Sequence, residues 1–161
     1  MQIYRSKKEI KKDKNTVLTI GTFDGVHEGH KDLFNKLTEE TRANSYRNLI
    51  ITFEPHPMTI LSNSNVGLLT TYNEKIELFE LLGIENLLVL EFTKKFSEQS
   101  SEEFVKNIIC ENVGAKHIII GHDHKFGKNR SGNEELLRKL GERNDFFVTS
   151  VPPVTIDNEI V

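Results

Sequence analysis

The chain has 161 residues, 37% of them apolar, which is enough to bury one sizeable core and gives no sign of two domains. Its 21 Lys and Arg against 24 Asp and Glu give a formal net charge of −3, so the composition carries no electrostatic footprint for nucleic acid. A single cysteine, Cys110, excludes an intramolecular disulfide and fits a reducing, cytoplasmic environment. We expect no membrane association, because no apolar stretch approaches the length of a membrane span or a signal peptide.

Strand and helix patterns alternate along the chain, beginning with an apolar strand at 17–20 and a helix at 31–37. Further along, the sequence predicts strands at 49–53, 87–92, 117–120 and 146–151, and helices at 73–82, 101–112 and 134–141. The segments 54–71 and 121–133 are expected to be loops. Alternation of this kind is typical of an α/β fold with a parallel sheet, in which ligands bind beyond the carboxyl ends of the strands.

The loop after the first strand reads Gly-Thr-Phe-Asp-Gly-Val-His-Glu-Gly-His at 21–30. Free backbone N–H groups and the positive end of the helix dipole make the start of the following helix an anion site. Three glycines let the backbone approach a ligand closely, and His27 and His30 can donate hydrogen bonds to phosphate oxygens in either charge state. The loop therefore predicts a phosphate site. The structural alternative is a plain turn with surface histidines.

Two more polar loops follow strands. The segment Thr-Phe-Glu-Pro-His-Pro at 52–57 contains prolines that stiffen the chain, so we expect His56 to be held in place; the alternative is a rigid loop with an exposed histidine. The segment 121–132 combines cations, glycines and an aromatic residue, which suits a phosphorylated aromatic ligand. Its His122 and His124, expected to point the same way, lack further ligands nearby, so no metal site made of protein side chains is predicted.

In order and spacing, these three motifs resemble those of the FMN adenylyltransferase (FAD synthetase) module of bacterial bifunctional riboflavin kinase/FAD synthetases, within the nucleotidylyltransferase superfamily. The resemblance runs from about residue 17 to the end of the chain. It implies a Rossmann-like, doubly wound parallel sheet of the nucleotidylyltransferase type. It also implies transfer of AMP from ATP to FMN, giving FAD and pyrophosphate, with Mg²⁺ accompanying the ATP. The attack would be in line, without a covalent intermediate, so catalysis would depend on positioning and charge stabilisation.

The resemblance also implies roles for individual residues. His27 and His30 are expected to be catalytic, donating to the α-phosphate and to the leaving pyrophosphate. The residues expected to bind ATP lie in the first loop and are Gly21, Thr22, Phe23, Asp24, Gly25, His27, Gly29 and His30. The residues expected to bind FMN lie in the other two loops and are Pro55, His56, Pro57, Asp123, Phe126, Gly127, Asn129 and Arg130. Asp24 has a structural alternative, as a turn residue that caps its own backbone.

The chain departs from the family pattern at two places. Many relatives have Phe and Arg where this chain has His124 and Lys125, so a point charge replaces a planar guanidinium. The chain also stops at Val161, where the family continues into a Ser/Thr-rich motif with a nucleotide-binding arginine and then into a riboflavin kinase domain. We therefore expect residues 1–161 to be an FMN adenylyltransferase domain that is truncated before that motif and impaired in activity.

Two other functions stay open at this point. One is a different small-molecule nucleotidylyltransferase of the same superfamily, such as a cytidylyltransferase or a pantetheine-phosphate adenylyltransferase. The other is a flavin- or nucleotide-binding module that regulates without turnover.

Overall fold

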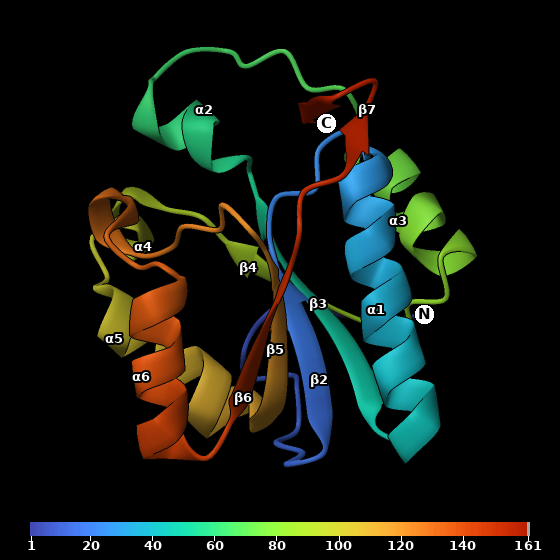
Figure 1. The fold of residues 1–161 in the computed structure, drawn as a ribbon. Coiled ribbons are helices and arrows are strands. Elements are labelled where there is room, and N and C mark those ends of the chain that lie inside the picture. The colour runs from blue at the N-terminus through green and yellow to red at the C-terminus, as the bar shows by residue number, and fades with distance from the viewer. Residues whose placement is uncertain (161) are drawn as a thin grey trace.

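A six-stranded parallel sheet with helices on both faces forms the body of the computed structural model, which describes residues 1–160 (Figure 1). The sheet has the spatial order β1-β4-β3-β2-β5-β6. Its strands are β1 (Gln2–Tyr4), β2 (Thr16–Ile20), β3 (Arg47–Glu54), β4 (Asn86–Glu91), β5 (Ala115–Gly121) and β6 (Phe147–Val151). A small antiparallel hairpin follows the sheet and is made of β7 (Thr155–Ile156) and β8 (Glu159–Ile160).

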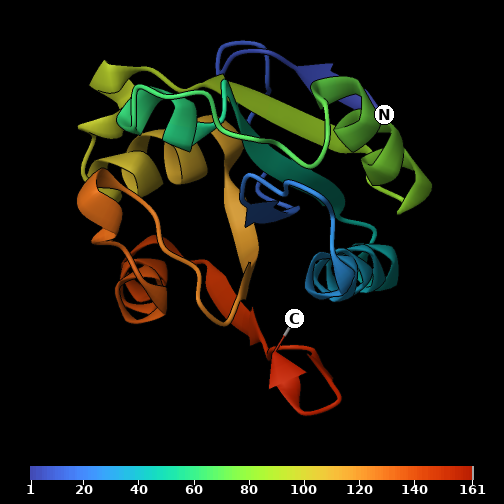
Figure 2. The same cartoon turned by 90° about the horizontal axis from the view of Figure 1, so that it is seen from above.

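Helices connect the strands and cover the two faces of the sheet. They are α1 (Glu28–Asn44), α2 (Pro57–Leu61), α3 (Tyr72–Leu81), α4 (Lys94–Ser97), α5 (Ser101–Phe104), the π-helical continuation η1 (Val105–Val113), the 3₁₀ turn η2 (Lys128–Arg130) and α6 (Glu134–Asn144). Seen from above, α1 and α3 lie on one side of the sheet, and α5 and α6 lie on the other (Figure 2).

The central strands are apolar on both faces because successive side chains of a strand point in opposite directions. On one face the side chains pack with α1 and α3; the strand residues there are Val17, Ile50, Leu87, Val89 and Ile119. On the other face the side chains pack with α5, η1 and α6; the strand residues there are Leu18, Ile20, Leu49, Ile51, Leu88, Leu90, Ile118 and Ile120. The sheet is therefore doubly wound, as the sequence predicted.

All the predicted strands and helices are present, and most ends differ by at most three residues, but the helix predicted at 31–37 runs from Glu28 to Asn44. Several short elements were not predicted: β1, which pairs with β4 at the edge of the sheet, the helices α2, α4 and η2, and the hairpin β7–β8. The helix predicted at 101–112 has α-helical geometry only in its first turn and continues as a π-helix to Val113. The segment 54–71, expected to be a loop, contains one helical turn, α2, which begins at Pro57.

The sheet has its topological switch point between β2 and β5. These strands are neighbours at the centre of the sheet, whereas β3 and β4 lie beside β2 and β6 lies beside β5. The chain leaves β2 and β5 in opposite directions, which opens a crevice beyond their carboxyl ends. The loops 21–30 and 121–133, which carry two of the three motifs, follow these two strands.

Candidate active site

The three loops singled out in the sequence meet around one cavity of about 720 Å³, a size typical of small-molecule sites. Thirteen of the expected site residues line it: Gly21, Thr22, Phe23, His27, Gly29, His30, His56, Pro57, Asp123, Phe126, Gly127, Asn129 and Arg130. Among the described residues, Asp24, Gly25 and Pro55 lie outside this lining. The fold thus brings together side chains that are up to about a hundred positions apart in the sequence.

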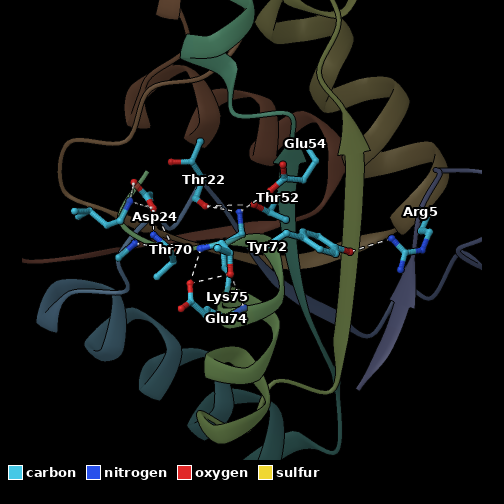
Figure 3. Close-up of polar contacts among 12 residues, drawn as sticks. Arg5, Thr22, Asp24, Thr52, Glu54, Thr70, Tyr72, Glu74 and Lys75 are labelled. Atoms are coloured by element: carbon cyan, nitrogen blue, oxygen red, sulfur yellow. Dashed lines mark hydrogen bonds and ion pairs between the residues drawn. The ribbon is translucent and has the colours of Figure 1, made fainter. Parts of the chain in front are cut away.

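Asp24 connects the first loop to the segment that precedes α3 (Figure 3). Its carboxylate accepts hydrogen bonds from Leu69 N at 3.0 Å, from Thr70 N at 2.9 Å and from Thr70 Oγ1 at 3.0 Å. Desolvation by itself would raise the pKa of Asp24, but these hydrogen bonds hold that pKa below its ordinary value. Asp24 is therefore an ionised structural link to residues 45 positions away, rather than a cap on its own turn.

The Phe23 side chain packs into the core beneath the first loop, against Gly21 and His30 of the same loop. Its ring is buried and makes edge contacts with Phe34 at 5.0 Å and with His30 at 5.2 Å between ring centroids. A Cβ atom on Gly21 would come within 2.7 Å of the Phe23 ring, so the ring can occupy this place only because residue 21 is glycine. Phe23 positions His30 and forms part of the cavity wall.

His27 and His30 form a stacked pair at the start of α1. Their ring centroids are 3.6 Å apart and the rings are inclined by 23°. Burial, with a smaller contribution from His27, lowers the pKa of His30 to about 4, so that this imidazole is neutral near pH 7. His30 Nδ1 is buried and has no hydrogen-bond partner within residues 1–160. A neutral imidazole keeps one N–H group, so His30 can donate one hydrogen bond to an anionic oxygen bound at the start of α1.

His56 starts α2. It is the N-cap of that helix, and its Nδ1 accepts a hydrogen bond from Met58 N at 3.1 Å. The imidazole is therefore fixed by its own helix as well as by the flanking prolines. Met58 and Leu61, which the sequence analysis did not single out, come from the same turn and also line the cavity.

The third loop is attached to the start of α5. Phe126 and Gly132 pair through two backbone hydrogen bonds, and Ser101 Oγ donates to the Phe126 carbonyl at 3.2 Å. Gly127 has φ +76°, and a side chain there would clash with Ser101. Phe126 is only 8% exposed, so its ring is mainly part of the core and reaches the cavity with one side. The exposed cations of this loop line the cavity beside it and are Lys125, Lys128 and Arg130.

His122 and His124 both line the cavity, but they lie in a turn and not on a strand, and they differ in exposure. A tight turn, closed by a hydrogen bond from His124 N to the Gly121 carbonyl at 3.2 Å, interrupts the alternation, so that His122 is exposed while His124 Nε2 is buried. The His124 ring stacks on Phe126 at 5.8 Å, and burial lowers the pKa of His124 to about 4. Residues 1–160 contain no group of three His, Cys, Asp or Glu side chains that could hold a metal ion.

The sequence analysis missed an aromatic wall of the cavity. Phe53, Phe92 and Phe96 contact one another at 5.5–5.9 Å between centroids, and Phe104 contacts Phe96 at 6.2 Å. All four line the cavity, together with Lys94, Glu98 and Gln99 from the same region and with residues 151–154 after β6. The signal was present in the sequence, because Phe53 and Phe92 each stand at the carboxyl end of a predicted strand.

Comparisons with known proteins show the family of the chain. Residues 9–161 match the family described as FAD synthetase. The chain is 36% identical over 162 residues to a bifunctional riboflavin kinase/FMN adenylyltransferase of Buchnera aphidicola, covering 99% of this chain and 52% of that protein. The chain thus spans about half the length of the curated relatives it matches.

Solved structures share the fold. A Streptococcus pneumoniae protein described as a macrolide-efflux protein superposes with a TM-score of 0.82 at 25% identity, covering 99% of this chain and 53% of that one. Pantothenate synthetase of Thermus thermophilus superposes with a TM-score of 0.63 at 14% identity, covering 98% and 63%. The second likeness supports the nucleotidylyltransferase type of fold. Within residues 1–160, no helix is both long enough and apolar enough to cross a membrane.

Proposed function

The chain belongs to the FAD synthetase family, and we propose that it catalyses the transfer of AMP from ATP to FMN, giving FAD and pyrophosphate. The observation that carries this proposal is a single cavity lined both by a stacked pair of histidines at the start of a helix and by four phenylalanines in mutual contact. Such a cavity has separate places for a polyphosphate and for a flat aromatic ring.

ATP is placed with its phosphates at the first loop. The start of α1 directs backbone N–H groups and its positive dipole toward this place, and His27 and His30 lie there. His30 is neutral near pH 7 but still carries one N–H group, which can donate a hydrogen bond to an oxygen that becomes more negative during the reaction. Phe23 and Gly21 hold this donor in place before ATP binds.

FMN is placed with its ring system against the aromatic wall. Phe53, Phe92 and Phe96 offer apolar surface of matching character, and Met58 and Leu61 of α2 cover the same region. The cations of the third loop, Lys125, Lys128 and Arg130, carry charge that complements a phosphate group. His56 and Pro57 also line the cavity and are assigned to the FMN side in this proposal.

The reaction proposed for this arrangement is one in-line displacement. An FMN phosphate oxygen forms a bond to the α-phosphorus of ATP, the bond from that phosphorus to the bridging oxygen breaks, and pyrophosphate leaves with the electron pair. The attacking oxygen is already anionic at neutral pH, so the mechanism needs no general base. The protein contributes alignment of the two phosphates and stabilisation of charge on the leaving group.

Mg²⁺ is part of the proposal as a partner of ATP. Mg²⁺ usually keeps several waters and binds through one or two carboxylates together with substrate phosphates. Asp123 and Glu98 are carboxylates of the cavity lining, whereas the Asp24 carboxylate already accepts three backbone and hydroxyl hydrogen bonds. These residues fit an ion carried largely by the nucleotide, which would neutralise charge on its phosphates.

We also propose that adenylyl transfer by residues 1–161 alone is slower than by a chain carrying the arginine segment of the family. The cations that line the cavity lie in α4 and in the third loop. The first loop, where we assign the leaving pyrophosphate, contributes histidines and no lysine or arginine to the described lining, so an added arginine would neutralise charge on the pyrophosphate. We propose further that the full protein carries a C-terminal riboflavin kinase domain, in keeping with the name of the bifunctional relative. Its proposed location is the cytoplasm.

The decisive test is to incubate the protein with Mg²⁺, ATP and FMN and to measure FAD by chromatography. Parallel reactions replace ATP by CTP, and FMN by phosphopantetheine. Formation of FAD only from ATP and FMN would support the proposal. Product from CTP or phosphopantetheine would instead indicate another nucleotidylyltransferase, and tight binding of FMN without any turnover would indicate a regulatory module.

A further inference from the structure

Lys75 lies in the middle of the polar contacts behind the first loop (Figure 3). It is on α3 and is only 7% exposed. Its ammonium group donates a hydrogen bond to the Thr22 carbonyl at 3.2 Å and contacts Glu54 Oε1, also at 3.2 Å. Thr52 Oγ1 donates to the same carbonyl at 3.5 Å. A lysine so deeply buried is uncommon, and it requires partners for its charge.

The two partners of Lys75 belong to two different loop segments, of which Thr22 lines the cavity itself and Glu54 lies next to lining residues. Thr22 lies in the first loop, which carries the histidine pair, whereas Glu54 ends β3 and directly precedes the Pro55-His56-Pro57 segment. The strands β2 and β3 are neighbours, so the two loops leave the sheet side by side. One ammonium group therefore fixes the spacing between the segment we assign to ATP and the segment we assign to FMN.

The position of Lys75 is itself set by a well-defined helix start. Thr71 and Glu74 form a reciprocal capping box, in which Thr71 N donates to Glu74 Oε2 at 2.7 Å and Glu74 N donates to Thr71 Oγ1 at 3.3 Å. The preceding residue, Thr70, is held by the Asp24 carboxylate. The first turn of α3 is thus tied to the first loop at Asp24 and, through Lys75, at Thr22.

We propose that Lys75 is a positioning residue, whose ammonium group aligns the first loop with the 54–57 segment by holding the Thr22 carbonyl and the Glu54 carboxylate together. This inference rests on the proposed function, because the two segments are those that we assign to the two substrates. Lys75 does not line the cavity formed by the described residues, so its effect on the reaction would pass through Thr22 and Glu54. Small misplacements of aligned groups can cost up to about 10²-fold in rate.

The test replaces Lys75 by methionine, which keeps the length of the side chain and removes its charge. Lys139→Met is the matched control, because Lys139 makes an exposed ion pair with Glu135 on α6, outside the cavity lining. We expect Lys75→Met to lower kcat for FAD formation roughly tenfold or more, with KM for FMN changed less than about threefold. Glu54→Gln, whose side chain is 34% exposed and can tolerate the change, should lower kcat in the same direction.

Two further measurements separate positioning from folding. Thermal unfolding of each variant fixes an assay temperature at which all are folded, and a double variant, Lys75→Met with Glu54→Gln, should lower kcat by less than the product of the two single effects. Hydrogen exchange of the backbone amides of residues 21–25 should be faster in Lys75→Met than in Lys139→Met. If Lys75→Met does not fold, Glu54→Gln takes its place in the test. A lower kcat and faster amide exchange in Glu54→Gln would support the positioning role, and unchanged values would overturn it.

The outcomes distinguish the inference from the proposed function. If the wild-type protein forms FAD and Lys75→Met has the kcat and the amide exchange of the control, the positioning role is overturned. If the wild-type protein forms no FAD, the proposed function fails, and the exchange data alone judge whether Lys75 fixes the first loop. Unchanged exchange in that case would overturn the inference as well.

Discussion

His30 owes its chemical character to its neighbours rather than to its position in the sequence. The ring of Phe23 contacts it from one side and His27 stacks on the other, so a proton added to His30 would be poorly solvated and close to a second imidazole. Both effects lower the pKa of His30 to about 4. A donor that stays neutral responds to charge that develops in the reaction and does not bind the substrate phosphates as a fixed cation.

The first prediction concerns this pair. His27→Ala and His30→Ala should each lower kcat for FAD formation on the order of 10²-fold to 10³-fold, because each removes a donor that is fixed before the reaction begins. The Kd for FMN, measured by quenching of flavin fluorescence, should change little. His117→Gln is the control, since His117 contacts Glu40 and Thr149 and does not belong to the described cavity lining. Wild-type kcat in both alanine variants would contradict the assignment of phosphates to this loop.

At the residue level, the sequence predicted which loops matter better than it predicted what each side chain does. Gly21 and Phe23 were expected to contact ATP, yet their clearest role is mutual, since the glycine makes room for the ring. Asp24 was left between a ligand role and a cap on its own turn, and it binds backbone 45 residues away. The ten-residue motif at 21–30 does not contain Leu69 or Thr70, so the hydrogen bonds of Asp24 to these residues could not be derived from it.

The element that shapes the proposed flavin side is α2, a single turn that sequence reasoning assigned to a loop. Five residues are too few to show a helical period, and a helix this short depends on its caps. His56 supplies the N-cap and Pro57 the first position, so the same two residues that looked like ligands also build the turn. The structure shows the capping role of His56 directly, whereas a contact between His56 and FMN stays a prediction.

The second prediction separates these two roles of His56. His56→Ala should remove both the cap and the ring, whereas His56→Asn should keep the cap, because asparagine is among the best N-cap residues. If the imidazole contacts FMN, both variants should weaken FMN binding, measured by calorimetry, with ATP binding nearly unchanged. Normal FMN binding in His56→Asn together with weak binding in His56→Ala would show that His56 acts only through α2.

The third prediction concerns the aromatic wall, whose phenylalanines come from β3, from the residue after β4, and from α4 and α5. Phe96 contacts Phe53, Phe92 and Phe104 and lines the cavity, so Phe96→Ala should weaken FMN binding roughly tenfold through loss of aromatic contact. Phe147→Ala is the control, because Phe147 is 70% exposed and outside the described cavity lining. A stronger effect on ATP than on FMN would reverse the assignment of the two walls.

At the scale of the whole molecule, the sequence was most informative where the pattern was longest. Apolar runs of alternating strands and helices predicted an α/β fold with a parallel sheet, and the family resemblance implied that this sheet is doubly wound. The rule that ligands bind beyond the carboxyl ends of parallel strands then predicted where the three loops meet. The edge strand β1 was missed because three residues, none of them buried, carry no detectable period. The π-helix at Val105–Val113 was not predicted because π-helices are rare, so an apolar helical segment is expected to be α-helical.

The last prediction concerns the pH dependence of folding. The pKa values of His30 and His124 are lowered to about 4 in the folded protein, from an ordinary value near 6.5 in the unfolded chain. Between these two values the unfolded chain binds more protons than the folded one, so the free energy of unfolding should fall as the pH decreases from about 7 to 4. Above pH 7 neither histidine should contribute to the slope.

A single substitution should isolate the contribution of His124. In His124→Phe the ring can still stack on Phe126, while the buried Nε2, which lacks a partner within residues 1–160, is removed. The variant should be more stable than the wild type by about 1–3 kcal/mol at pH 7, and by a larger margin at pH 5, where protonation penalises only the wild type. His122→Phe, at an exposed position in the same loop, is the control for adding a phenylalanine to this loop. Chemical unfolding at both pH values measures these differences, and equal slopes for the wild type and His124→Phe would mean that His124 is already charged in the folded protein at pH 5.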